Sequence, residues 1–402
     1  MQLRALPTNI VLLSLAMSGA SSALAQTDDV LRPYVATSLT FDDNVLGLPS
    51  PEVAALITGS RKTADVSRSN QAGLKLQKML GRQLITADLG VNDVRYERYS
   101  RLNYQGRNVA AEWRWVLGSR LEGKIAASYV RTLTPFEDYL SIERRLRIER
   151  RQDAEFRYRF HPRWRIRGAV GAYDTEYDIS GFTSGTRDEV SREAGLDYVT
   201  PEGNFVGLSA RRLSGANPVP LSAGGATIRS NFKQEDIRVR IDWRAGGKTR
   251  VRFVGGPLSR RHPSFGTKDF RGVNARLNLD WSITGKSSIS GAVWRELSNV
   301  DDLSVAYALS KGVSVGPRWS ISSKLETDLQ LRHEIRDFRL AQAVAQAAPY
   351  GDTLRSAIWS VNYAYDPHWV VRMATFRTLK EGRGRLSDFG RNAATVSLRY
   401  EF

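Results

Sequence analysis

The last ten residues of the chain alternate strictly between apolar and polar side chains. The apolar set shares one face and comprises Ala394, Val396, Leu398, Tyr400 and Phe402. The polar set shares the other face and comprises Thr395, Ser397, Arg399 and Glu401. Because successive side chains of a strand point to opposite faces, this segment is apolar on one side and polar on the other. A wall between lipid and a polar interior requires that pattern, which predicts a membrane-spanning strand.

The same alternation recurs along most of the chain. The clearest predicted strands are 109–117, 121–131, 146–160, 164–173, 237–243, 273–281, 324–335, 359–365 and 371–377. Weaker candidates are 33–41, 72–78, 85–96, 190–198, 205–211, 250–254, 289–295 and 305–315. With the terminal strand these make about eighteen, and single-chain bacterial barrels have even strand numbers. Sixteen is the alternative, because several of the weaker strands are short. Residues 340–348 are rich in Ala and Gln, and we interpret them as a loop.

The predicted connections alternate between short and long. The short ones are 80–82, 118–120, 161–163, 200–204, 246–248, 284–286, 316–318 and 366–368. The long ones are 42–69, 132–141, 180–189, 214–235, 255–271, 337–353 and 379–392. Short periplasmic turns and long extracellular loops are typical of outer-membrane barrels. The pattern therefore predicts an all-β, transmembrane, antiparallel up-and-down barrel with both termini on the periplasmic side.

Three of the short connections place a proline two residues before a tryptophan. The pairs are Pro162 with Trp164, Pro317 with Trp319, and Pro367 with Trp369. Proline suits a hairpin tip because it presets φ and donates no ladder hydrogen bond. Tryptophan suits the membrane interface, so we predict an aromatic girdle at the periplasmic side. Its members are Trp164, Trp319, Trp369 and Phe402. Chance recurrence of proline in turns is the alternative.

Arginine predominates on the polar face of several predicted strands. Facing lipid at the membrane midplane, each would cost about 2–4 kcal/mol, so these side chains must face the interior. They form a predicted basic track for anionic groups, comprising Arg147, Arg151, Arg157, Arg159, Arg165, Arg167, Arg238 and Arg240. Guanidinium groups bind carboxylates and phosphates in bidentate fashion. The alternative is that interleaved carboxylates pair with them across neighbouring strands and merely stiffen the wall. These carboxylates are Glu149, Asp153, Glu155, Asp242, Glu326 and Asp328.

Two polar residues fall on the otherwise apolar face of the predicted strand 146–160. They are Arg150 and Gln152, near the end of the strand that leads from a long connection. We expect this strand to extend past the bilayer on the outer side, where both side chains meet water.

The formal net charge of +17 raises the possibility of nucleic-acid binding. However, the basic residues are spread over alternating strands rather than gathered in one stripe, helix or tail. An anionic partner, or lipopolysaccharide phosphates at the barrel rim, fits the distribution better. The chain has no Cys, which excludes disulfides and a lipid-anchored lipoprotein.

Catalysis finds little support in the sequence. There are four His, and two of them, His161 and His368, lie in predicted turns, so no metal site or cofactor is predicted. His333 faces outward by its position in the alternation. The Asp42-Asp43-Asn44 cluster is interpreted as a turn after a strand, with a Ca²⁺ site as the alternative.

The N-terminal segment has the features of a cleaved secretory signal. Arg4 precedes an apolar stretch over residues 10–20, and Ala23-Leu24-Ala25 fits a cleavage site. The predicted organisation is a signal peptide at 1–25 followed by one barrel domain at 26–402, located in the Gram-negative outer membrane.

Several segments resemble known outer-membrane proteins. The terminal strand ending at Phe402 resembles the C-terminal strand of bacterial barrels, which implies the barrel-assembly machinery as a partner. The segments 33–46, 95–104 and 113–120, with 131–139, resemble the exopolysaccharide-operon outer-membrane proteins of the EpsL type, within the β-barrel porin group. That resemblance implies a barrel working with periplasmic secretion components on a polysaccharide, without catalytic residues.

Three functions follow in order of preference. The first is export of an exopolysaccharide, anionic if the arginines bind it, through an Arg-rich lumen. The second is a general or anion-selective diffusion porin for small solutes, and the third is a barrel-embedded hydrolase. The predicted loops 214–235 and 255–271 are the candidates for constricting the pore.

Overall fold

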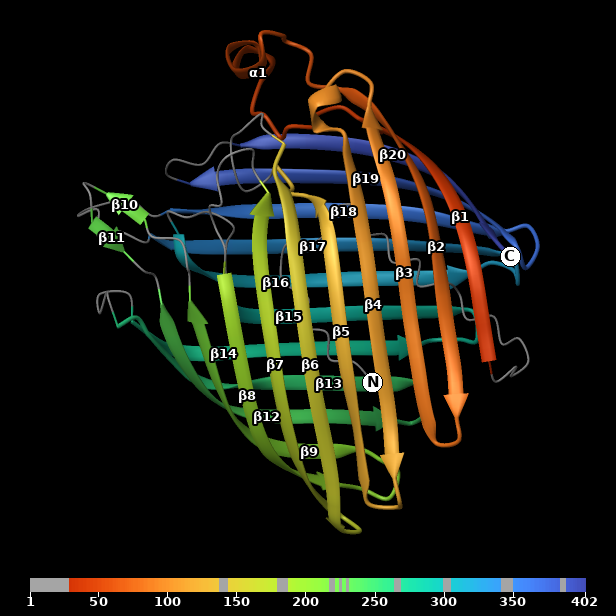
Figure 1. The fold of residues 1–402 in the computed structure, drawn as a ribbon, viewed down its shortest axis with the longest axis vertical. Coiled ribbons are helices and arrows are strands. Elements are labelled where there is room, and N and C mark those ends of the chain that lie inside the picture. The colour runs from red at the N-terminus through yellow and green to blue at the C-terminus, as the bar shows by residue number, and fades with distance from the viewer. Residues whose placement is uncertain are drawn as a thin grey trace.

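A computed structural model shows a closed ring of strands (Figure 1). It describes residues 29–136, 144–178, 187–216, 221–223, 226–228, 231–263, 269–298, 305–340, 350–383 and 388–402. Eighteen strands form one antiparallel sheet. The strands of the near wall cross those of the far wall steeply in Figure 1, as expected when strands are tilted against a barrel axis.

The strands of the ring run in chain order. In the first half they are β1 (Asp29–Asp42), β2 (Asp65–Leu80), β3 (Gln83–Tyr96), β4 (Tyr104–Leu117), β5 (Leu121–Leu133), β6 (Leu146–His161), β7 (Trp164–Asp178), β8 (Arg187–Val199) and β9 (Phe205–Ala216). In the second half they are β12 (Phe232–Ala245), β13 (Thr249–Arg261), β14 (Phe270–Ser282), β15 (Ser287–Ser298), β16 (Val305–Ser320), β17 (Leu325–Leu340), β18 (Gly351–Ala364), β19 (Trp369–Arg383) and β20 (Phe389–Glu401).

Each strand pairs with the next, and the last pairs with the first. The seam between β1 and β20 matches Val35 with Tyr400 and Leu39 with Val396. Strands β9 and β12 pair directly across a short hairpin of β10 (Leu221–Ala223) and β11 (Ala226–Ile228). The predicted count of eighteen and the antiparallel up-and-down order are therefore confirmed, and the alternative of sixteen is excluded.

The outer face of the ring is apolar where it would meet lipid. Large hydrophobic side chains remain exposed at alternate positions, for example Val35, Val91, Val109, Leu208 and Val293. The polar residues between them face the interior, as the alternation predicted. A closed ring also leaves no backbone edge unpaired, which a strand in lipid requires.

Two predicted connections are wrong, and both contain proline. Residues 316–318 lie inside β16, and the turn follows at 321–324. Similarly, 255–261 continue β13, so the loop predicted at 255–271 begins later. Pro317 has no pairing partner on β17, and Pro257 has none on β12. Each strand therefore continues past a proline because only one of its two ladders is interrupted there.

A short helix in the first connection escaped prediction. Helix α1 (Pro51–Thr58) begins with a hydrogen bond from the Val53 amide to Ser50 Oγ and ends at Gly59, whose φ of 76° suits glycine. It belongs to a small apolar cluster, the outer-end core, made of Val45, Leu46, Leu48, Ala54, Tyr99, Leu102 and Phe136. Figure 1 shows α1 beyond the strand ends, opposite the short turns.

The outer-end core draws on three successive connections. Tyr99 and Leu102 come from the connection that contains η1 (Ser100–Leu102), and Phe136 follows β5.

None of the described helices is long and apolar enough to cross a membrane. The predicted signal peptide at 1–25 lies outside the described residues, as does nearly all of 340–348.

The Asp42-Asp43-Asn44 cluster fastens the seam of the ring. Arg391 donates from Nε to Asp42 Oδ2 at 2.8 Å, and the Asn392 amide donates to Asp43 Oδ1 at 2.7 Å. Asn44 Nδ2 donates to the Gly390 carbonyl at 2.9 Å. We call these six residues the seam clamp. The carboxylates of Asp42 and Asp43 both accept hydrogen bonds from residues of β20. These contacts explain why the acidic residues lie here without invoking a bound cation.

Candidate functional site in the barrel interior

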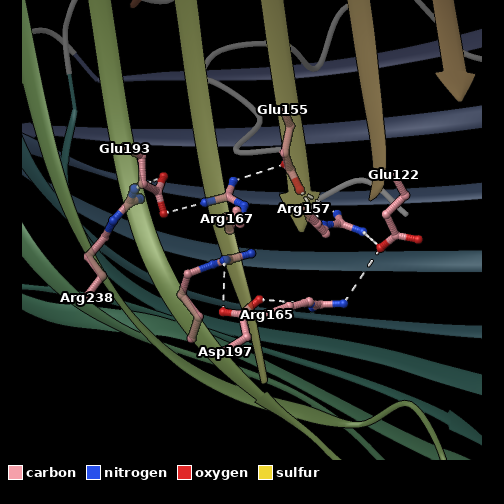
Figure 2. Close-up of polar contacts among 9 residues, drawn as sticks. Glu122, Glu155, Arg157, Arg165, Arg167, Glu193, Asp197 and Arg238 are labelled. Carbon is pink, nitrogen blue, oxygen red and sulfur yellow. Dashed lines mark hydrogen bonds and ion pairs between the residues drawn. The ribbon is translucent and has the colours of Figure 1, made fainter. Parts of the chain in front are cut away.

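The interior surface of strands β5 to β12 carries a continuous chain of alternating charges. Its nine members run in the order Arg238, Glu193, Arg167, Glu155, Arg157, Glu122, Arg165, Asp197 and Arg240. They come from β5, β6, β7, β8 and β12, and β9 lies between the last two of these strands. Figure 2 shows the side chains meeting on the interior side of the wall. We call this set the lumen charge network. Every carboxylate in it lies between two guanidinium groups, so the network has one positive charge in excess.

The contacts at the centre of the network are short. Arg167 contacts Glu193 at 2.6 Å and Glu155 at 3.0 Å, while Glu155 also contacts Arg157 at 2.6 Å. Towards the periplasmic turns the contacts lengthen. Arg157 and Arg165 lie 3.4 and 3.9 Å from Glu122, and Arg240 lies 3.7 Å from Asp197. Arg165 holds Asp197 more closely, at 2.9 Å.

The other three arginines of the predicted track lie on β6. Arg147 contacts Glu149 at 3.0 Å, and Arg151 contacts Asp153 at 2.7 Å. Both contacts join residues two apart on one strand, so the alternation alone brings them to the same face. Arg159 pairs with Arg165 in the β6–β7 register, and no carboxylate contact is recorded for it among the described residues.

Burial divides the predicted track into two groups. Arg147, Arg165, Arg167, Arg238 and Arg240 are mostly buried, with side-chain exposure between 4% and 17%. Arg151 is 42% exposed, Arg157 is 28% exposed, and Arg159 is exposed. Buried and paired guanidinium groups stiffen the wall, whereas the exposed group on β6 faces water. The ion pairs agree with the pairing interpretation for the buried arginines, and a track for anionic groups stays a prediction.

Aromatic rings on the interior face were missed in the sequence. The Phe205 ring lies 4.7 Å from the Arg165 guanidinium and 5.4 Å from that of Arg240. Four strands further round the ring, on β15, Trp294 lies between Arg276 and Arg332, at 5.0 and 4.9 Å. Its indole lies over Gly312, where a Cβ would collide with it. The inward parity of these rings was visible in the sequence, but their partners depend on the register between strands.

The predicted girdle residues all lie on the outer face. Trp164 and Tyr198 form an edge-to-face pair with 5.3 Å between ring centroids, and Trp369 and Tyr400 are 4.7 Å apart. Phe402 is 62% exposed and packs edge-on against Tyr400. Trp319 is also exposed, although it stands near the end of β16 and not after a turn. Their role in the membrane interface stays a prediction.

The predicted strand extension past the bilayer is supported by contacts. Arg150 faces outward and bonds to Asp174 at 2.6 Å and Glu176 at 3.0 Å on β7. Three charges on the outer face cannot lie in lipid, so these strands continue beyond it.

Among the described residues there is no group of three or more potential metal ligands.

Comparisons with known proteins add the following. No protein-family model matches the chain, and no curated protein matches it. Among solved structures, the outer-membrane protein OpdK of Pseudomonas aeruginosa is 11% identical, with a TM-score of 0.47 over 93% of this chain and 99% of that one. A BenF-like porin of Pseudomonas fluorescens Pf-5 is 10% identical, with a TM-score of 0.49 over 93% and 99%. OccAB3 of Acinetobacter baumannii is 10% identical, with a TM-score of 0.48 over 93% and 99%.

None of these matches supports the exopolysaccharide-operon identity that the resemblance implied. The location follows from the molecule itself. The ring has an apolar outer face and a charged inner face. The outer face must therefore meet lipid and the inner face water, because the opposite arrangement would bury dozens of charges in lipid. The chain is an eighteen-stranded β-barrel of the Gram-negative outer membrane.

Proposed function

We propose that the barrel is a passive diffusion channel for small anionic solutes. The observation that supports this most directly is the set of arginines on the inner face of β6 that keep part of their surface open, namely the partly exposed Arg151 and Arg157 and the exposed Arg159. Their exposed surface lies inside a closed ring, where the only solvent is water in the lumen. Barrels of 16–18 strands are wide enough to hold an aqueous passage.

The charge distribution favours anions only moderately. The lumen charge network has five guanidinium groups against four carboxylates, and Asp153 partly balances Arg151. A small excess of positive charge in a confined passage raises the local concentration of anions without binding them tightly. Tight binding would slow release, so a weak, distributed attraction suits passage better than a single deep site.

Export of an exopolysaccharide has weaker support. It depends on the resemblance of a few N-terminal segments, and no feature of the barrel interior favours a polymer over a small solute. A barrel-embedded hydrolase has weaker support still. His333 faces outward, His161 and His368 lie at the periplasmic turns, and the buried His262 lies between the rings of Phe232 and Tyr307.

Planar-bilayer recording of the purified barrel tests the proposal. Wild-type protein should show stable open channels, with a reversal potential in a KCl gradient that indicates anion preference. The double variant Arg151→Gln/Arg157→Gln should shift that potential towards cations at similar conductance. The matched control is Arg377→Gln, an exposed residue of the outer face of β19. It removes one positive charge from the other side of the wall and should leave selectivity unchanged.

Two outcomes would contradict the channel proposal. One is a wild-type barrel that stays closed under all voltages, and the other is equal selectivity in wild type and double variant. A deletion strain separates the channel from the exporter. Loss of small-anion uptake with normal secreted polysaccharide supports the channel, whereas lost polysaccharide with normal uptake supports export.

A further inference from the structure

The outer face of the barrel places like charges directly opposite one another near its extracellular end. Five cross-strand pairs join two basic residues: Arg68 with Arg95, Arg107 with Arg131, Arg192 with Arg212, Lys233 with Arg261, and Arg295 with Lys311. Like charges in directly opposed positions destabilise a sheet. The opposed cations occur in five hairpins around the ring. Because strand pairing does not favour them, they need another explanation, such as an anionic partner outside the protein.

These residues face away from the lumen. Each shares its face with exposed apolar side chains of the same strand, such as Val109 beside Arg107 and Val190 beside Arg192. All five pairs lie on the side of the apolar band where the long connections emerge. We call these ten residues the outer basic belt.

The internal partners of the belt are incomplete. Arg95 contacts Asp93 at 2.8 Å, Arg131 contacts Asp178 at 3.1 Å and Arg212 lies 4.0 Å from Glu235. Lys311 lies 3.8 Å from Asp337. By contrast, Arg68, Arg107 and Arg192 have no carboxylate contact within the described parts of the chain, and all three are exposed. In these pairs one cation is neutralised by the protein while its neighbour is not. The lumen shows the opposite arrangement, since the opposed Arg157 and Arg167 share Glu155 between them.

The opposite end of the outer face carries aromatic rings instead. Trp113, Trp243 and Trp319 are exposed on the strands that also carry Arg107, Lys233 and Lys311. On β16, Lys311 and Trp319 are eight residues apart, about 26 Å along the strand at the usual rise. A tilt of about 40° reduces this to about 20 Å across the membrane, close to the height of an apolar barrel band. The belt therefore lies at the headgroup level of one leaflet only.

We propose that the outer basic belt binds the phosphate groups of lipopolysaccharide in the outer leaflet. Phosphate suits these positions because one anion placed between two opposed basic groups relieves their repulsion and accepts hydrogen bonds from both. Zwitterionic lipid would not do so, because its own ammonium group balances its phosphate. The acidic residues Asp174 and Asp188 interrupt the belt at β7 and β8, so binding should be divided among separate positions around the ring.

Binding of purified lipid A to the detergent-solubilised barrel tests the proposal. Native mass spectrometry counts the bound molecules, using bisphosphorylated lipid A and its enzymatically dephosphorylated form as probes. Wild-type protein should retain several bisphosphorylated molecules and few dephosphorylated ones, and high salt should remove the difference. The triple variant Arg68→Gln/Arg107→Gln/Arg192→Gln should bind at least tenfold more weakly, and the corresponding triple Lys variant should retain most of the binding.

The matched control removes the same charge at the other end. Arg82→Gln/Arg120→Gln/Arg163→Gln changes three residues of the periplasmic turns and should bind lipid A as wild type does. Equal loss of binding in this control would overturn the proposal, since it would mean that only total charge matters. Undiminished binding by the belt variant, or equal binding of dephosphorylated lipid, would overturn it as well.

Thermal unfolding provides a second test, in which the order of stability of wild type and belt variant should reverse when lipid A is added. In neutral detergent without lipid A, the belt variant should unfold at the same temperature as wild type or higher, because repulsion between opposed cations is removed. With bisphosphorylated lipid A present, wild type should become the more stable of the two. A belt variant that is less stable already without lipid would show that these arginines serve the fold, and the proposal would fail.

Discussion

At the scale of single residues, shared carboxylates determine how the inner wall is held. Glu193 lies between Arg167 and Arg238 and is only 11% exposed, so its removal leaves the buried Arg238 without an ion-pair partner among the described residues and leaves Arg167 with Glu155 alone. Glu122 also serves two arginines, but it is 40% exposed, and each of these arginines has a second carboxylate. The same chemical change should therefore have very different consequences at the two positions.

We predict that Glu193→Gln lowers the free energy of unfolding by about 3 kcal/mol, the usual cost of breaking a buried ion pair from one side. Glu122→Gln, the matched control, should cost less than about 1 kcal/mol because water screens its contacts. Urea unfolding of the refolded barrel in lipid vesicles, followed by tryptophan fluorescence, measures both. Similar losses for the two variants would show that burial does not decide the strength of these contacts.

Asp366, in the turn between β18 and β19, is a carboxylate whose contribution to stability depends on its hydrogen-bond partners. Its Oδ1 accepts hydrogen bonds from the backbone amides of His368 and Trp369, both at 2.8 Å. These amides, Trp369 first, lower the pKa of the Asp366 carboxyl below its ordinary value. A carboxyl with a lowered pKa in the folded state stabilises the fold above its ordinary pKa, and this contribution is lost as the pH falls through the lowered value.

Asp366→Asn should therefore be less stable than wild type at pH 7 and equal to it at low pH, because asparagine keeps an acceptor but has no charge. Melting temperatures between pH 7 and pH 2.5 measure the difference. Asp366→Ala, which removes the acceptor altogether, should remain less stable than wild type throughout. A constant gap between the Asn variant and wild type would contradict the role of the charge.

At the scale of elements, the outer-end core is a separate unit of packing. Leu102 is fully buried among Val45, Leu46 and Tyr99, whereas Leu56 on α1 is 87% exposed. Removing a buried leucine side chain costs about 2–5 kcal/mol. Because this core lies beyond the strand ends, the loss should open the connection locally without loosening the ring.

We predict that Leu102→Ala makes the connection between β1 and β2 sensitive to added protease while the urea midpoint of the barrel stays unchanged. Leu56→Ala is the control and should resist protease as wild type does. Mass spectrometry of the fragments identifies the cleaved segment. A lowered barrel midpoint in Leu102→Ala would show that the core supports the ring itself.

The strands were largely predictable because alternation reports which face meets lipid. The errors arose where one residue type suits two structures, as with Pro317 and Pro257, which suggested turns but lie in strands with one interrupted ladder. Helix α1 was missed because eight residues inside a long polar connection give too short a helical pattern. Its apolar residues pack against connections distant in sequence, which no local pattern reports.

The interior arginines were predictable only in part. The contacts of Arg147 and Arg151 join neighbours two residues apart, so the alternation indicates them. The contact of Arg238 with Glu193 depends instead on how β12 pairs with β9, across a connection whose length says nothing about register. Burial, which separates structural arginines from exposed ones, follows from these pairings and was not available from the sequence.

At the scale of the whole molecule, the barrel is polarised from end to end. On its outer face, exposed tryptophans lie towards the short turns and the outer basic belt lies towards the long connections, while the lumen charge network holds five guanidinium groups and four carboxylates. The proposed channel and the proposed lipid contacts use opposite faces of the same wall. Neither depends on the other, so the tests of selectivity and of lipid binding can succeed or fail separately.

The seam clamp sets an order of events during assembly. Asp42 and Arg391 are 349 residues apart in the chain, so their contact can form only after the last strand has been made and has reached the first. Until then β1 and β20 are open edges, able to pair with each other or with strands of another chain. The clamp lies at the outer end of the seam, the part farthest from the periplasm. Its formation would therefore mark the moment when a chain held open by its assembly factors becomes a finished barrel and can be released.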